Sequence, residues 1–279
     1  MFSLTMLIIA FGSGIFAAAI GALAAFIFCG FAGLIGVAII LSGGPDTILN
    51  QMAFGVFFGP HISFAAAVAA AAYAGRKKLL DSGSDIVTPL IKFNDVSVLL
   101  VGGLFGSLGY VLQLLFSNGK LTIDTVGLTV LVSAVIARFL FGKTGLFGKY
   151  EDKNKKREFL PDIKSFAYII VQAFGLGIVI SYFVGITHIS TIGFLISAAS
   201  LVILQMGFAF PVTHHITLIA GYATMATGNL WIGTLFAVIA ALVGEVIGRT
   251  INSFSDSHID PPATTIALLS LVIFTFIQR

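Results

Sequence analysis

Long apolar runs constrain this chain more than any other feature of its sequence. Several of them reach the roughly 20 residues that a helix needs to cross the 30 Å hydrocarbon core of a bilayer. Only 10% of the 279 residues are charged and 58% are hydrophobic, whereas soluble domains carry about 25% charged residues. No segment alternates in the way that strands of a transmembrane barrel do. The sequence therefore predicts an all-α polytopic membrane protein.

The N-terminal segment MFSLTMLIIAFGSGIF lacks the basic region and the cleavage pattern of a secretory signal. We expect it to be retained as the first membrane helix. The single cysteine, Cys29, excludes an intrachain disulfide.

The basic residues predict the topology. Most of them fall in two polar segments, 76–95 and 142–164. The positive-inside rule places both segments in the cytoplasm. An even number of spans should then separate them, which fits helices at 96–116 and 122–141. We therefore expect a multi-pass protein of the cell membrane, with both termini extracytoplasmic.

The two halves of the chain resemble each other. QMAFGVFFGPHIS at 51–63 aligns with QMGFAFPVTHHIT at 205–217. Three shorter matches follow the same order, once gaps are allowed: AFGSGI with AFGLGI, GGLFG with GTLFA, and IDTVGLT with IDPPATT. We expect repeat one at 1–141, a charged cytoplasmic linker at 142–164 and repeat two at 165–279.

Each repeat should contain about five helices, ten in all. An odd number per repeat makes the two halves face opposite ways, which is the inverted-repeat plan of many transporters. The segment 189–200 is too short to span the membrane alone. It therefore either crosses as part of a longer helix or is re-entrant. The expected helices are 5–27, 28–42, 47–75, 96–116, 122–141, 165–184, 189–200, 201–228, 230–249 and 261–277.

Two of these helices are interrupted near their midpoints. Gly59 and Pro60 break the helix at 47–75, and Pro211 breaks its counterpart at 201–228. Proline removes a backbone donor, and broken helices in a membrane are tolerated only against protein or a water-filled cavity. Paired interruptions in corresponding segments are the best pointer in a sequence to a transport site. We expect a narrow passage between the repeats at this depth.

Histidines accompany both breaks. His61 and His215 occupy aligned positions, and His214 adds a third imidazole. The alternative is structural, because proline kinks are common in membrane helices and a buried histidine often bonds across helices. No acidic ligand lies near the three histidines in sequence, so we predict no metal site. The other expected lining residues are Ser63, Thr217, Gln51, Gln205, Phe54, Phe58, Phe208 and Phe210.

Acidic residues are scarce and mostly lie at helix ends. Asp124 and Asp260 occupy matching helix starts, where we expect them to act as N-caps. Only Asp46 and Glu245 are candidates at membrane depth, and an intramembrane carboxylate is a candidate coupling group. The structural alternatives are a helix cap for Asp46 and an ion pair with Arg249, four residues on, for Glu245.

The segments AFIFCGFAGLIGVA, FGVFFGPHISFAAAVAAAAYAGRK and LLVGGLFGSLGY resemble a prokaryotic family of multi-pass membrane proteins described as hypothetical proteins or permeases. That resemblance implies no substrate. The five-plus-five plan, with paired histidines beside phenylalanines, is similar in architecture to ammonium and urea channels, although this chain is far shorter than the ammonium family. The similarity implies a channel for a small polar solute and a homo-oligomer, typically a trimer.

Three classes of function follow. The first is a channel or facilitator for a small polar solute or ion. The second is a secondary transporter coupled to protons or Na⁺, and the third is a membrane enzyme or an assembly subunit. The sequence contains no P-loop, H-E-x-x-H or G-x-S-x-G motif, so we predict no enzyme, no cofactor and no nucleic-acid partner.

Overall fold

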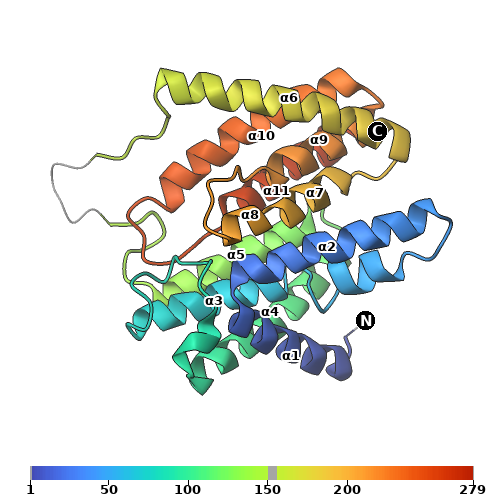
Figure 1. Cartoon of the computed structure of the whole chain (residues 1–279). Coiled ribbons are helices and arrows are strands. Elements are labelled where there is room, and N and C mark those ends of the chain that lie inside the picture. Colours follow the sequence, from blue (N-terminus) through green and yellow to red (C-terminus); the bar gives the residue numbers. More distant parts are fainter. Residues whose placement is uncertain (1, 150–155, 279) are drawn as a thin grey trace.

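The computed structural model describes residues 2–149 and 156–278, and these residues form eleven α-helices and no β-strand (Figure 1). The all-α prediction is confirmed. Three short segments of other helix type are present: the π-helices η1 and η3, and the 3₁₀-helix η2. The elements are α1 (Leu4–Ile20), α2 (Ala22–Leu41), η1 (Ile48–Ala53), α3 (Ser63–Arg76), η2 (Leu90–Phe93), α4 (Val96–Asn118), α5 (Thr125–Phe141), α6 (Ile163–Thr187), α7 (Ile192–Ser200), α8 (Val202–Gln205), α9 (His214–Thr227), α10 (Leu230–Ile251), α11 (Pro261–Val272) and η3 (Ile273–Ile277).

Four of the described helices, α2, α4, α6 and α10, are long and apolar enough to cross a membrane. Shorter apolar helices lie at α1, at α5, over α7 and α8, and over α11 and η3. The outer faces carry large apolar side chains that no part of the described chain covers, among them Leu104, Val171, Ile186, Leu235 and Phe276.

The helices of the two halves pack in the same order. In the first half α1 lies mainly against α4, and α3 contacts α1, α4 and α5. In the second half α6 lies mainly against α10, and α9 contacts α6, α10 and α11. The halves meet where α2 packs on α7 and α5 packs on α11, in the middle layer of Figure 1.

Small residues allow the closest of these approaches. A Cβ on Gly14 of α1 would lie 2.2 Å from the carbonyl oxygen of Gly102 in α4. A Cβ on Gly30 of α2 would lie 2.3 Å from the backbone nitrogen of Ala199 in α7. Glycine at these positions lets the backbones touch, as in tightly packed membrane helices.

Helices α5 and α11 run antiparallel. The backbone N–H of Asp124, at the start of α5, donates to Ser270 Oγ near the end of α11 (2.8 Å). At the other end of α5, the buried Arg138 donates to Ser257 Oγ (2.9 Å), just before α11 begins. Asp124 and Asp260 accept hydrogen bonds from the backbone N–H groups of Gly127 and Ala263, so both predicted N-caps are confirmed.

The described residues 76–95 and 142–149 of the two basic segments lie at one end of the molecule, around the connection 252–260. Arg138 also donates to the carbonyl oxygens of Leu146 (2.7 Å) and Ile251 (2.5 Å). The backbone N–H of Lys143 donates to Asp256 (2.7 Å), and Gly83 forms an isolated parallel bridge with Ser257. Both chain termini lie toward the opposite end (Figure 1).

Several helix boundaries differ from those expected. The helix expected at 5–27 ends at Ile20, because Gly21 adopts φ +93°, and α2 begins directly after it. The segment expected at 189–200 contains α7, whose nine residues are too few to span alone. Residues 150–155 of the expected linker lie outside the described residues.

Candidate functional site

Both expected helix interruptions are present. The first is the non-helical stretch 54–62 between η1 and α3, and the second is 206–213 between α8 and α9. At the first, the hydroxyl of Ser63 donates to the carbonyl oxygens of Phe58 (3.0 Å) and Gly59 (3.3 Å). The side chain therefore satisfies the carbonyl group of Phe58, which a continuous helix would have bonded through a backbone N–H.

At the second interruption α9 begins directly at His214 without a side-chain cap. The hydroxyl of the preceding Thr213 bonds to Ser197 Oγ instead (2.9 Å). Within the described residues, the backbone N–H groups of His214, His215 and Ile216 have no hydrogen-bond partner. The first turn of α9 thus presents three free donors, as an uncapped helix start does.

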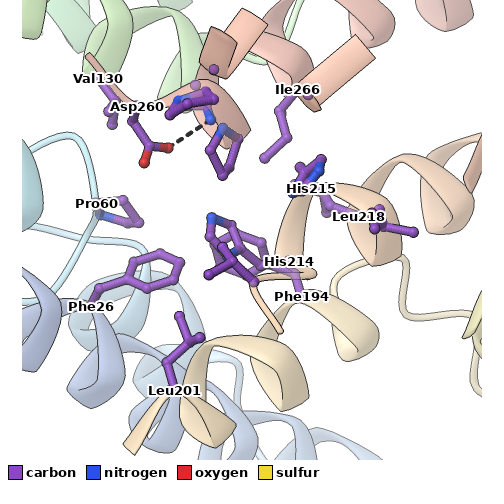
Figure 2. Close-up of a pocket in the computed structure, with 18 of the residues that line it drawn as sticks. Phe26, Pro60, Val130, Phe194, Leu201, His214, His215, Leu218, Asp260 and Ile266 are labelled. Atoms are coloured by element: carbon purple, nitrogen blue, oxygen red, sulfur yellow. Dashed lines mark hydrogen bonds between the residues drawn. The ribbon is translucent and has the colours of Figure 1, made fainter. Parts of the chain in front are cut away.

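A cavity of about 850 Å³ lies beside these donors (Figure 2). Its wall includes Pro60 from the first interruption and Pro211 from the second, so both breaks border the same space. Residues of both halves line it, and most are apolar. The aromatic members are Phe26, Phe54, Phe64, Tyr168, Phe194, Phe210 and Tyr222.

The two adjacent histidines are held on this wall by packing. The ring of His214 packs against those of Phe26 (4.7 Å between centroids) and Phe194 (5.7 Å), and the ring of His215 is 6.0 Å away. Figure 2 shows the ring of His214 below Asp260 and the ring of His215 beside Ile266. The two residues are 6% and 7% exposed, and Nδ1 of each has no partner in the described residues.

Three carboxylates also line the cavity, and each already has a donor. Asp260 bonds to His258 Nε2 (3.2 Å), the dashed line of Figure 2. Asp124 accepts from the hydroxyl of Tyr222 (2.5 Å), and Glu245 from Nε of Arg249 (2.6 Å). The predicted helix ion pair of Glu245 is therefore formed. Among the described lining residues there is no lysine or arginine.

The structure brings some of the predicted residues to this cavity and leaves others elsewhere. On its wall lie His214, His215, Phe54, Phe210, Pro60, Pro211 and Glu245. Outside its lining lie His61, Ser63, Thr217, Gln51, Gln205, Phe58, Phe208, Gly59 and Asp46.

Each residue outside the lining has an identifiable environment. His61 is buried, with its carbonyl group against Gly109 of α4. Phe58 stacks on Phe57 and Phe28, with centroids 4.0 and 5.4 Å apart. The Thr217 hydroxyl donates to the carbonyl oxygens of Thr213 and His214.

The remaining residues lie near the surface. Gln205 donates to the carbonyl oxygen of Val87 (3.1 Å), while Gln51 and Phe208 are exposed. Asp46 is also exposed, and its carboxylate accepts from the side-chain amide of Asn50 (2.6 Å) instead of capping a backbone N–H.

Some lining residues were not expected from the sequence. Asp124 and Asp260 were assigned only as caps, yet both carboxylates also border the cavity. A histidine two residues before a capping aspartate, as in His258 and Asp260, is the signal that could have identified this pair. Phe26 and Phe194 carry no such signal, because nothing distinguishes them from the other phenylalanines of the chain.

The model of a family of unknown function, DUF7973, matches residues 1–167 and 148–277. The chain therefore belongs to this family. Comparisons with curated proteins and with solved structures found no match.

Proposed function

We propose that this member of the DUF7973 family is a membrane transport protein, a channel or facilitator that passes a small polar solute or ion through the cavity between its halves. One observation carries the proposal: Pro60 and Pro211, from the two interrupted segments, border the same cavity. Irregular backbone at membrane depth is tolerated where it lines such a space, and the meeting of paired broken helices is where transporters bind their solutes.

The surface of the molecule supports a position in the bilayer. Four described helices are long and apolar enough to span it, and large apolar side chains cover their outer faces. Such a surface is costly in water but compatible with lipid. The segments 76–95 and 142–149 lie at the same end of the molecule, as expected of two cytoplasmic loops in the cell membrane.

The packing order supports an inverted repeat of five plus five helices. Helices α1, α3, α4 and α5 contact one another as α6, α9, α10 and α11 do. In such a repeat α5 and α11 are equivalent and should point in opposite directions. Their antiparallel contact, with Asp124 of α5 bonded to Ser270 of α11, meets this requirement. The exposed apolar faces of α4, α6 and α10 would also serve a homo-oligomer.

A coupled secondary transporter is the second candidate, supported by two carboxylates on the cavity wall. Asp260, bonded to His258, and Glu245, paired with Arg249, could bind a proton or Na⁺ that crosses together with the solute. A facilitator works without an ion gradient, whereas a coupled carrier accumulates its solute only when a gradient is imposed.

Reconstitution into proteoliposomes tests both candidates. Stopped-flow light scattering, with and without a pH gradient, would measure the entry of urea, ammonium, glycerol, formate and simple ions. Entry above that of empty vesicles supports transport, and a requirement for the gradient selects the coupled carrier. A folded protein that passes none of a wide set of solutes would contradict the proposal.

Two matched substitutions test whether the solute passes through the cavity. Ile266→Trp adds bulk to the cavity wall, where Ile266 is 4% exposed, while Ile186→Trp adds it to the outer face of α6, where Ile186 is 58% exposed. We expect Ile266→Trp to lower entry and Ile186→Trp to leave it unchanged. Equal entry through both variants would place the route elsewhere.

A further inference from the structure

Resting on the transport function proposed above, we infer that the cavity takes an organic carboxylate, whose carboxylate group binds the N-terminus of α9 beside His214 and His215. The inference names the chemical class of the solute. It follows from which hydrogen-bonding groups of the wall are still free and which are already paired.

Three backbone groups at the start of α9 are free donors. Helix α9 is 14 residues long, and its first three N–H groups, those of His214, His215 and Ile216, have no partner in the described residues. All three residues line the cavity. A helix N-terminus carries about half a positive charge, and free N–H groups there bind anions readily.

The imidazoles give a second, independent indication. His214 and His215 are more than nine-tenths buried, and Nδ1 of each lacks a partner in the described chain. Leaving a buried polar group unpaired costs free energy. A ligand that supplies acceptor atoms would satisfy the backbone donors of α9, and its negative charge would lie beside the two rings.

The carboxylates of the wall, by contrast, are already engaged. Asp124 accepts from the backbone of Gly127 and from Tyr222. Asp260 likewise accepts from the backbone of Ala263 and bonds to His258. The third carboxylate, Glu245, has its ion pair with Arg249. These carboxylates would favour a cation if they were free, but their charge is offset by helix N-termini and nearby donors.

The size and lining of the cavity indicate the rest of the ligand. About 850 Å³ lies within the range of pockets that hold small organic molecules, and it exceeds what ammonium or urea would need. Phe26, Phe54, Phe194 and Phe210 offer apolar and aromatic contacts. We therefore infer that the carboxylate group is attached to an apolar or aromatic group. Benzoate is a suitable probe.

Binding to the purified full-length protein in detergent tests the charge preference directly. Three probes share a benzene ring and differ in charge: benzoate, benzamide and benzylamine. At pH 7 we expect benzoate to bind about tenfold more tightly than benzamide, and benzylamine to bind most weakly. Tightest binding of benzylamine, or equal binding of all three, would overturn the inference.

Substitutions sharpen this test. His214→Ala and His215→Ala should each weaken benzoate binding, whereas His188→Asn, which removes an imidazole outside the cavity lining, should not. Asp260→Asn should strengthen benzoate binding, because asparagine still caps α11 while the negative charge facing the histidines is lost. A gain of affinity cannot arise from misfolding, and weaker binding by Asp260→Asn would contradict the inference.

The inference and the transport proposal fail in different ways. Benzoate binding without benzoate flux in proteoliposomes would support the carboxylate site and contradict transport of that ligand. Flux of a cation or a neutral solute, with no preference for benzoate in the binding assay, would support transport and overturn the carboxylate site.

Discussion

The two interrupted segments have similar sequences and very different surroundings. In the first, residues 58–62 are buried, and the ring of Phe58 stacks on those of Phe28 and Phe57. In the second, residues 206–209, 211 and 212 are exposed, and the following histidines line the cavity. The first break reaches the cavity through Phe54 and Pro60, but its residues 58–62 are packed within the protein, whereas the second break leaves space for a ligand.

The position of the helix start explains the difference. When the chain is aligned on His61 and His215, Ser63 matches Thr217, but α3 begins at Ser63 while α9 begins three residues earlier than Thr217, at His214. His61 thus precedes its helix, whereas His214 and His215 form the first turn of theirs. The spacing of proline contributes, since Pro60 directly precedes His61 and Pro211 lies four residues before His215. Matching residues therefore do not guarantee matching sites.

The largest expected effect comes from removing an aromatic ring at each break. Phe58→Ala should lower the free energy of unfolding by about 3–5 kcal/mol, the usual cost of emptying a buried phenylalanine site. Phe210→Ala should cost much less, because Phe210 is only partly buried and already borders empty space. Equilibrium unfolding in detergent micelles would measure both. Equal losses would show that the second break is as tightly packed as the first.

A pair of glycines tests the same contrast with a single methyl group. A Cβ on Gly109 would lie 2.0 Å from the backbone oxygen of His61, so Gly109→Ala must displace backbone. A Cβ on Gly244 would lie 2.7 Å from Nε2 of His215, a side chain that can turn into the cavity. We expect a loss of about 1–3 kcal/mol for Gly109→Ala.

For Gly244→Ala we expect little loss of stability but altered benzoate binding, since the substitution moves His215. The same unfolding and binding assays measure both outcomes. A larger loss of stability from Gly244→Ala than from Gly109→Ala would contradict the description of the second break as open.

Chemical accessibility compares the histidines directly. Cys29 is buried, and its thiol lies 3.1 Å from the carbonyl oxygen of Ala53. In a Cys29→Ala background, a cysteine introduced by His214→Cys should react with a water-soluble methanethiosulfonate much faster than one introduced by His61→Cys. Mass spectrometry over time gives both rates. Faster labelling at position 61 would show that the first break, and not the second, is the open one.

Local rules of sequence predicted part of this structure. Proline and glycine located both interruptions, and the caps at Asp124 and Asp260 followed from the preference of helix starts for aspartate. The ion pair of Glu245 with Arg249 followed from helical spacing. Each of these depends on residues a few positions apart, which is why a single sequence contains enough information.

The remaining features depend on long-range packing. Nothing near Gly21 in the apolar run indicated that the chain would turn there, since the run also contains glycines that stay helical, such as Gly14. The alignment treated His61 and His215 as equivalent, yet contacts with α4 and with the cavity place them differently. The division into repeats at 1–141 and 165–279 stays a prediction.

The smallest expected effect concerns the connections that follow the two breaks. Asp95 caps α4 through the N–H groups of Ser97 and Val98 and also pairs with Lys77, whereas Asn229 caps α10 through Trp231 and Ile232 without an ion pair. Asp95→Asn would make the first connection resemble the second, because asparagine is an equally good cap. Only an exposed ion pair is lost, so the melting temperature should fall by about 2 °C or less.

The pH dependence identifies this pair more sharply than the melting temperature does. Hydrogen bonds from Lys77 and Ser97 lower the pKa of Asp95 from 3.8 to about 2. A carboxyl group whose folded pKa is lowered contributes stability above its unfolded pKa and loses that contribution as the pH falls through its folded pKa. Between about pH 4 and pH 2 the wild type should therefore lose stability that Asp95→Asn does not have to lose. The melting temperatures of both proteins, measured across this pH range, test the prediction. If they fall in parallel, the pair contributes nothing and the two connections differ only in sequence.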